Sequence, residues 1–482
     1  MANFVHKFQS AIPLPLTDVV LKDVVKKAKD WAIMHGAAMR SKTKFSEDSI
    51  QFAPFVLIPS PFPKKEFYKA IEVQLFLNEM MHWVAHNPEF LLNCLKDAAL
   101  SDEFTGNLYK IYRTILEEGV AQNVSLGLLR SDYMAHKDAG NRINQVELNT
   151  IASSFAGIAS QFKSLNRFVL EELGHFDKVD NLPDNNALNG LCEGMLEAWK
   201  IYGKQDASIL FIVEDITYNI CDQRFHEFEL KKLHPKMKVL RRTLTQIVSQ
   251  AELTDKKELI IDNHEVAVIY FRAGYEPGHY PSQKEWEARL LMERSKAIKC
   301  PSIQYHLAGT KKVQQELART GVVEMFLSDS YKIDAVKEIF TGLYSLDFDE
   351  SGNKAVQMAL DSPERFVLKP QREGGGNNVY GVDVKEAILQ MKDKHERTAW
   401  ILMDRINPPI ISGYMVRPEG PDKPDLVDMV SELGIFGVVI GDPKSIMVNR
   451  QVGHMLRTKI STANEGGVAA GLGALDSPYL ID

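Results

Sequence analysis

The chain has little of what several protein classes require. It contains four cysteines in 482 residues, and no two of them form a C-x-x-C pair. Widely spaced thiols exclude a disulfide framework and are typical of a reducing compartment. No apolar run approaches the ~20 residues that cross a bilayer, and the N-terminal MANFVHKFQS lacks the design of a secretion signal. We therefore expect a soluble, cytoplasmic protein with no membrane partner.

Several catalytic patterns are also missing. The 13 histidines form no H-E-x-x-H or other paired metal motif, and no G-x-S-x-G nucleophile elbow is present. We interpret the isolated His454 as a packing or hydrogen-bonding residue rather than a catalytic one. A net charge of −7 without a basic stripe argues against a nucleic-acid partner, although local positive clusters can still gather small anionic substrates.

The length predicts more than one domain, because single cores stop growing at ~250–300 residues. Apolar runs at 208–213 and 266–271 alternate with a helical pattern at 222–233, which predicts a parallel sheet. We therefore expect a mixed α/β protein. An inserted substrate-binding domain at 206–305 would separate an N-terminal part, residues 1–205, from residues 306–482.

Other segments carry clear local patterns. Residues 66–118 are helical with an interruption at Pro88, and two strands of a hairpin follow from Gly127. Further helices are predicted at 160–172 and 187–202. We expect a turn-rich connection at 347–353 and a core strand at 432–440, followed by a shorter strand at 446–449.

The chain is organised around RFVLKPQREGGGNNVYG at residues 365–381, where a short buried strand ends at Lys369. Glycines leave the backbone free to reach φ > 0 and to bring bare N–H groups against a ligand. Lys369 before the loop and the carboxylate of Glu373 at its start suggest a site for a nucleotide phosphate that is bound together with a divalent metal ion. The spacing fits neither a Walker A loop nor G-x-G-x-x-G, and the alternative is a flexible surface hairpin. The loop residues are Glu373, Gly374, Gly375, Gly376, Asn377 and Asn378.

A second candidate lies in VELNT, where Glu147 and Asn149 are two residues apart. On a strand both side chains point to one face. A carboxylate and an amide oxygen suit Mg²⁺, which takes one or two carboxylates plus phosphate oxygens, and Glu373 could add a further ligand. The alternative is a solvated strand face.

Basic residues follow apolar segments at several points. Arg130, and Arg272 with Tyr275, stand where strands end, and guanidinium groups there suit carboxylates. Arg457 and Lys459 share one face of an extended tail and precede a small-residue loop that could close over an anionic substrate. Structural ion pairs and a charged terminal strand remain the alternatives.

Seven collinear blocks resemble the eukaryotic glutathione synthetases, from about residue 58 to the C-terminus: RSDYM, VELNT, YFRAGY, IKCPSIQYHLAGTKKVQQEL, KPQREGGGNN, SELGIFG and RTK…EGGVAAG. The resemblance implies an ATP-grasp fold with a glycine-rich lid at about residues 345–410. It also implies a homodimer that joins γ-glutamylcysteine to glycine with ATP and a pair of Mg²⁺ ions. The dipeptide carboxylate would attack the γ-phosphate of ATP, and the glycine amine would displace phosphate from the acylphosphate.

The resemblance also assigns roles to residues, position by position. The metal ligands would be Glu147, Asn149 and Glu373. Nucleotide contacts would come from Lys311, Lys369, Gly374, Gly375, Gly376, Asn377, Asn378, Tyr380, Met403, Asp404, Glu432 and Lys459. The dipeptide and glycine would be bound by Arg130, Ser154, Gln223, Arg272, Tyr275, Arg457, Val468 and Ala469. Arg457, Gly374 and Gly375 would stabilise the oxyanions that develop during the reaction.

Three positions depart from the family pattern. Ala152 replaces the first serine of S-A-S, Thr217 stands where the family has a glutamate near the amine of the dipeptide, and Asp404 is shorter than the usual glutamate. Ala469 and Ala470 resemble the glycine-using type. Two alternatives stay open: a related ligase with another acceptor such as β-alanine, and a nucleotide-binding regulatory protein.

Overall fold

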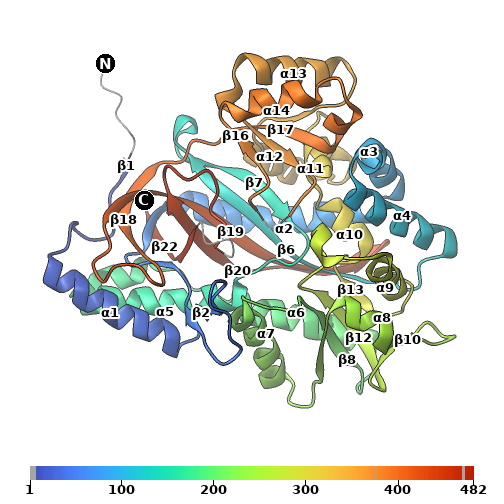
Figure 1. Ribbon diagram of the computed structural model, residues 1–482, viewed down its shortest axis with the longest axis horizontal. Coiled ribbons are helices and arrows are strands. Elements are labelled where there is room, and N and C mark those ends of the chain that lie inside the picture. Colours follow the sequence, from blue (N-terminus) through green and yellow to red (C-terminus); the bar gives the residue numbers. More distant parts are fainter. Residues whose placement is uncertain (1–6, 374, 469–472) are drawn as a thin grey trace.

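The computed structural model describes residues 7–373, 375–468 and 473–482. These residues form a mixed α/β fold, which confirms the fold class predicted from the sequence. Figure 1 shows a large sheet across the centre, a second sheet below it and a small sheet with two helices at the top of the view.

The central sheet has eight strands in the order β1-β18-β4-β21-β20-β19-β6-β7. Strand β19 is longer than the strand predicted at 432–440, because its first residues pair with β18 and residues 429–442 pair with β20. The apolar pattern of β19 alone does not show these partner strands, so it underestimates the length of the strand. The strands are β1 (Lys7–Phe8), β4 (Phe55–Val56), β6 (Ser125–His136), β7 (Arg142–Asn149), β18 (Ile410–Val416), β19 (Leu426–Asp442), β20 (Ser445–Ile460) and β21 (Ala474–Asp476).

Helices cover both faces of β19, which explains its nearly continuous apolar sequence. Ile435 and Val439 belong to the core that includes α2, whereas Phe436 and Val438 belong to the core that includes α5 and α6. A Cβ at Gly437 would lie 2.2 Å from Asn78 Oδ1, so glycine lets α2 approach the sheet closely. The covering helices are α2 (Lys64–Ala85), α5 (Ala156–Glu172) and α6 (Ala187–Tyr202).

The predicted parallel sheet is present between residues 206 and 305. Strands β8, β9, β12 and β13 pair in parallel, and β10 and β11 add antiparallel strands beside β12. Parallel strands place their carboxyl ends at one edge, which is where ligands bind in open α/β sheets. The strands are β8 (Ser208–Ile212), β9 (Val239–Arg242), β10 (Ala251–Leu253), β11 (Leu259–Ile261), β12 (His264–Phe271) and β13 (Ile298–Cys300).

The small sheet has its own hydrophobic core, formed by residues between 344 and 402. The turn-rich connection predicted at 347–353 is wrong in its second half, because α13 begins at Glu350. Asp349 caps this helix by accepting a 2.6 Å hydrogen bond from the Gly352 backbone, and Ala355 and Ala359 bury its inner face. The elements are β14 (Leu343–Ser345), β15 (Phe366–Pro370), β16 (Val379–Tyr380), β17 (Trp400–Asp404), α13 (Glu350–Asp361) and α14 (Asp383–Met391).

Pro88 breaks the helical segment 66–118 as predicted. It occupies the first turn of α3, where Asn87 caps the helix by accepting a 3.0 Å bond from the Phe90 N–H. The remaining helices are α1 (Asp18–Met34), α3 (Pro88–Ser101), α4 (Glu103–Glu118), α7 (Ile220–Leu233), α8 (Leu244–Gln250), α9 (Gln283–Glu293), α10 (Ile303–Ala308), α11 (Lys311–Leu317) and α12 (Ser330–Ile339). The remaining strands are β2 (Ala38–Met39), β3 (Gln51–Phe52), β5 (Ser60–Pro63) and β22 (Pro478–Ile481).

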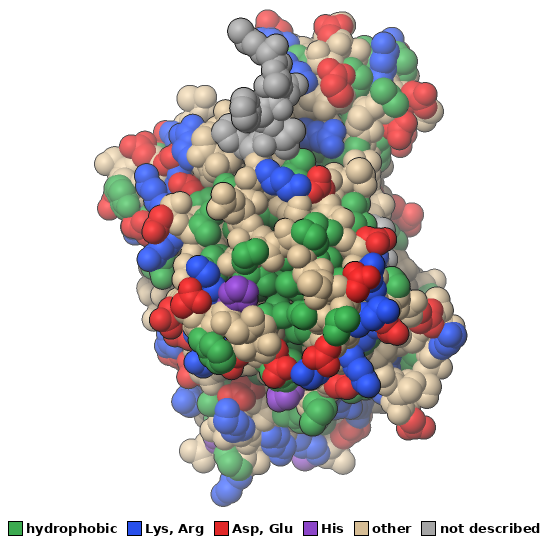
Figure 2. Space-filling view, turned by 90° about the vertical axis from the view of Figure 1, so that its left-hand side faces the viewer, with side chains coloured by type: hydrophobic (Ala, Val, Ile, Leu, Met, Phe, Trp, Pro, Cys, Tyr) green, Lys and Arg blue, Asp and Glu red, His purple; other side chains and the backbone are tan. Residues whose placement is uncertain are grey.

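Within the described ranges, no helix is both long enough and apolar enough to cross a membrane. Figure 2 shows that apolar side chains gather in the middle of one face, between groups of mixed charge. Two of the most exposed large apolar side chains of the chain, Val19 at 81% and Met34 at 80%, lie at opposite ends of α1.

His454 is a packing residue in the core, in agreement with the interpretation from the sequence. It is buried on β20, and its ring packs edge-on against Phe67 at 5.1 Å. Burial lowers its pKa to about 3, from an ordinary 6.5. The unfolded chain therefore binds a proton at this ring as pH falls below 6.5, whereas the folded chain does not until about pH 3.

We expect His454 to make the fold acid-sensitive between pH 7 and pH 5. Lowering the pH over this range should cost about 2 kcal/mol of unfolding free energy at this residue. His454→Gln should reduce the loss by that amount, measured by urea unfolding at both pH values. His35→Gln, at the exposed end of α1, is the control. An equal pH dependence in wild type and His454→Gln would contradict the prediction.

Candidate functional site

A cavity of about 380 Å³ lies between the central sheet and the small sheet. Strands β6, β7, β19 and β20 form one wall, β15 and β17 form the opposite wall, and residues 461–468 close one side. Predicted site residues that line it are Arg130, Glu147, Asn149, Ser154, Tyr275, Lys369, Glu373, Gly375, Asn378, Tyr380, Met403, Asp404, Glu432, Arg457, Lys459 and Val468.

The sheet register brings the charged residues of this wall together. Asp132 pairs with Glu147 across β6 and β7, and Glu432 pairs with Arg457 across β19 and β20. Because side chains alternate along a strand, residues two positions apart share the same face. A Cβ at Gly434 would lie 2.8 Å from Asp132 Oδ1, so glycine there leaves room for the charged cluster.

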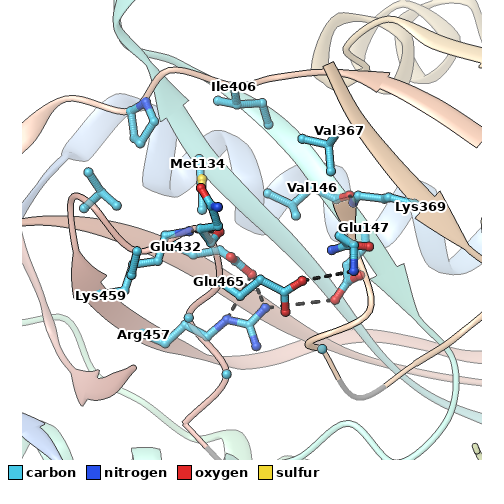
Figure 3. Close-up of a pocket in the computed structure, with 18 of the residues that line it drawn as sticks. Met134, Val146, Glu147, Val367, Lys369, Ile406, Glu432, Arg457, Lys459 and Glu465 are labelled. Carbon is cyan, nitrogen blue, oxygen red and sulfur yellow. Dashed lines mark hydrogen bonds and ion pairs between the residues drawn. The ribbon is translucent and has the colours of Figure 1, made fainter. Parts of the chain in front are cut away.

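Arg457 lies at the centre of this cluster. Its guanidinium donates to Glu432, with Nε 3.0 Å from Oε1, and lies 4.0 Å from Glu147 (Figure 3). It also lies 3.5 Å from Asp132. Burial alone would lower the pKa of Arg457, but the surrounding carboxylates raise it, so it stays charged. Asp132 also receives two bonds from Arg130, at 2.7 and 2.8 Å.

Lys311, at the start of α11, connects the two predicted carboxylate ligands. Its Nζ lies 3.1 Å from Glu147 Oε2 and 3.0 Å from Glu373 Oε1. Burial alone would raise the pKa of Glu147, but Lys311, Lys369 and Arg457 hold it below its usual range. For Glu373, burial and the nearby Glu147 raise the pKa. The cations of the cluster therefore lower the pKa of Glu147, whereas at Glu373 the effect of burial is larger than theirs.

The oxygen groups here suit a hard cation. Asn149 uses its amide nitrogen in bonds to the Arg130 carbonyl and to Asp132, which leaves the amide oxygen for a ligand. Among the described residues, no three histidine, cysteine or acidic side chains converge tightly enough to hold a metal ion alone. Two carboxylates and an amide fit a Mg²⁺ ion that shares its shell with phosphate oxygens.

The other end of the cavity is apolar. Met134, Val146, Val367 and Ile406 converge there (Figure 3), together with Met403. Asp404 stands at the edge of this apolar end, where its Oδ2 accepts a 3.1 Å bond from Tyr344. An apolar slot with a few polar groups on its edge suits a flat heterocycle such as a purine.

Two loops meet over the polar end. The glycine loop places Gly375 and Gly376 at φ +76° and +82°, whereas Gly374 lies outside the described residues. The Glu465 carboxylate accepts hydrogen bonds from the backbone N–H groups of Gly376 and Asn378, the latter at 3.2 Å. A carboxylate thus binds N–H groups of the loop that the sequence assigns to phosphate.

Several predicted residues lie away from the cavity wall. Asn377 lines a neighbouring hollow with Arg372. Gln223 accepts a 2.9 Å bond from Arg241, and Arg272 lies behind the wall, where it donates to Ser154 Oγ at 2.7 Å and to Asp222 at 3.3 Å. Ala469 and Ala470 lie outside the described residues.

Sequence reasoning missed some residues of the site. Asp132 follows Arg130 by two positions in RSDYM, so strand alternation was a usable signal for it. Lys137 and Arg405 line the cavity from loops, and Glu465 reaches the glycine loop across 89 residues of sequence. Local patterns carry no signal for such long-range contacts.

Comparisons with known proteins place the chain in one family. Residues 18–480 match the family model of the eukaryotic glutathione synthase, ATP binding domain. The chain is 43% identical to the glutathione synthetases of Xenopus laevis and Homo sapiens, over 96% of this chain and 97% of each relative. A glutathione synthetase-like effector from Globodera pallida, solved in its apo form, is 24% identical with a TM-score of 0.77, covering 97% of this chain and 98% of that one. This likeness shows a shared fold. Because the family model matches nearly the whole length of this chain, the chain belongs to the eukaryotic glutathione synthetases, as its motifs suggested.

Proposed function

We propose that the chain joins γ-glutamylcysteine to glycine at the expense of ATP. The observation that carries this proposal is a single cavity in which an apolar slot leads to a buried cluster of Glu147, Glu373, Lys311 and Arg457. A purine base fits the slot and its phosphates fit the cationic end. The proposal includes the ATP-grasp arrangement, in which the central and small sheets hold the nucleotide between them.

Mg²⁺ fits the oxygen groups of Glu147, Glu373 and Asn149, and when bound it would offset the negative charge of the phosphates. Lys311 occupies the space between the two carboxylates and would move toward the phosphates as the cation enters. The number of ions, a pair in the family, is part of the proposal.

The chain itself would act mainly by positioning charge. The dipeptide carboxylate attacks the γ-phosphate, the bond between the β- and γ-phosphates breaks and ADP leaves, and the glycine amine then displaces phosphate from the acylphosphate. Little covalent chemistry falls to the protein, so preorganised positive groups lower the barrier. Arg457 would stabilise the developing oxyanions, supported by N–H groups of the glycine loop, including Gly374 and Gly375. Lys369 and Lys459 would neutralise the phosphates.

We expect bound nucleotide to order the glycine loop as a lid. Phosphate would replace the Glu465 carboxylate at the N–H groups of Gly376 and Asn378, and the closed loop would shield the acylphosphate from water. Hydrogen exchange at residues 375–378 should slow about tenfold or more with a non-hydrolysable ATP analogue and Mg²⁺. The analogue without Mg²⁺ is the control. Unchanged exchange at saturation would contradict the lid.

The assembly and the domain division are also proposals. The homodimer is proposed from the family to which the chain belongs. The separate core of the small sheet supports a lid at about 345–410, and the parallel sheet supports a distinct unit at 206–305. We place the enzyme in the cytoplasm, as its thiols suggest.

The direct test is to identify products by mass after incubation with ATP, Mg²⁺ and γ-glutamylcysteine. Parallel reactions would contain glycine, β-alanine or no acceptor. Glutathione formed only with glycine, matched one-for-one by ADP, is the expected result. If a ligated product forms with β-alanine but not with glycine, β-alanine is the acceptor. Nucleotide binding without any ligated product would overturn the proposal.

A further inference from the structure

Glu214 lies at the carboxyl edge of the parallel sheet, directly after β8 and Val213. Its neighbour Tyr275 follows β12, which pairs with β8, and lines the cavity. Tyr275 donates a 3.2 Å hydrogen bond to Glu214 Oε1. The carboxylate therefore lies next to Tyr275, which lines the cavity as Ser154 does.

The hydrogen bonds of His279 fix the state of this carboxylate. The Gly274 N–H donates to His279 Nδ1 at 3.0 Å, so Nδ1 is the acceptor and Nε2 carries the proton. Nε2 then donates to Glu214 Oε1 at 3.1 Å. Both bonds thus come from neutral donors to one oxygen, and among the described residues Oε2 has no hydrogen-bond partner.

Glu214 differs in this respect from the other acidic residues nearby. Asp132 is paired with Arg130, and Asp222 is fully buried, where it accepts from Arg272 and from the backbone N–H of Phe155. The side chain of Glu214 is 32% exposed, and no lysine or arginine of the described chain pairs with it. Burial raises the pKa of Glu214, but His279, Tyr275 and the nearby charge of Arg272 together lower it further, so the carboxyl group is ionised at neutral pH.

Thr217 cannot supply a negative charge here. It is 4% exposed, and its hydroxyl donates to the Glu214 backbone carbonyl at 3.2 Å. Thr217, at the position where the family has a glutamate, is therefore neutral, and its hydroxyl group points to the backbone. A carboxylate with a free oxygen lies three positions earlier in the same loop.

We propose that Glu214 binds the α-ammonium group of the γ-glutamyl moiety and makes the enzyme selective for substrates that carry it. The inference rests on the proposed function, since it names a contact to the dipeptide of that reaction. The free Oε2 would accept from the ammonium group, while Tyr275 and His279 hold the carboxylate in place. Charged hydrogen bonds of this kind are among the stronger ones.

The test compares γ-glutamylcysteine with glutarylcysteine, the same molecule without its α-amino group. Wild type should prefer the natural dipeptide by about 10- to 100-fold in kcat/KM, the range expected for a hydrogen bond between charged groups. Glu214→Gln should lower kcat/KM for γ-glutamylcysteine by a similar factor, mainly through KM. It should leave kcat/KM for glutarylcysteine nearly unchanged, so the preference falls toward one. The KM for ATP should not change.

Two further variants separate recognition from a structural clamp. Glu214→Asp keeps the charge and should retain more of the preference than Glu214→Gln. Glu276→Gln removes a carboxylate from the loop after β12, 3.6 Å from His279, and should keep the wild-type preference. Equal losses for both substrates in Glu214→Gln would show a structural role and overturn the inference. Wild-type kcat/KM for both substrates in this variant would overturn it as well. Wild type that forms no product at all would overturn the proposed function itself.

Discussion

Arg457→Ala should lower kcat by about 10²–10³-fold, the usual effect of removing one preorganised donor to a developing oxyanion. Arg457 touches Glu432, Asp132 and Glu147 at the polar end of the cavity, so its charge lies where the phosphoryl group would be transferred. The loss should appear in kcat more than in the KM for glycine. Steady-state kinetics with saturating ATP and dipeptide measure it.

The same change also leaves buried carboxylates without their cation. Removing one partner of a buried pair costs about 3–5 kcal/mol, so the melting temperature must be measured beside the rate. Arg457→Lys keeps the charge but loses the planar fork, and its rate should fall between wild type and alanine. Arg450→Ala, on the same strand, removes an exposed pair with Glu197 and should be neutral. Wild-type turnover by folded Arg457→Ala would exclude the role.

Glu147→Gln should be nearly as damaging, through the metal ion. Loss of a charged ligand removes about 3 kcal/mol or more of phosphate stabilisation, which is at least ~100-fold in rate. Lys311 would then keep only Glu373 as a carboxylate partner and would compete for the remaining ligand. The Mg²⁺ concentration for half-maximal rate should rise.

A binding experiment tests the metal role independently of turnover. Titration of Mn²⁺ in the presence of a non-hydrolysable ATP analogue should show about tenfold or more weaker binding in Glu147→Gln, since one charged ligand is lost. Glu117→Gln, on the exposed face of α4, is the matched control. If the metal affinity equals that of wild type while the rate is fully lost, Glu147 is not a metal ligand. Its role would then be to position Lys311 beside the phosphates.

The sequence by itself determined which chemical groups this cavity contains. Strand alternation places Glu147 with Asn149, and Arg457 with Lys459, on shared faces because side chains repeat every two residues. The glycine loop, the helix break at Pro88 and the parallel sheet follow from equally local rules, and the collinear motifs identified the family.

Only the tertiary structure decided which of these groups meet. The pairing of β19 with β6 and β20 brings Asp132 and Glu432 to Arg457, and α11 carries Lys311 to a position between Glu147 and Glu373. The same packing turns Gln223 toward Arg241, and it leaves Glu214 beside Tyr275 with one oxygen that has no hydrogen-bond partner among the described residues. These contacts join segments tens to hundreds of residues apart. Their positions depend on how sheets and helices pack together, which no local pattern of residues contains.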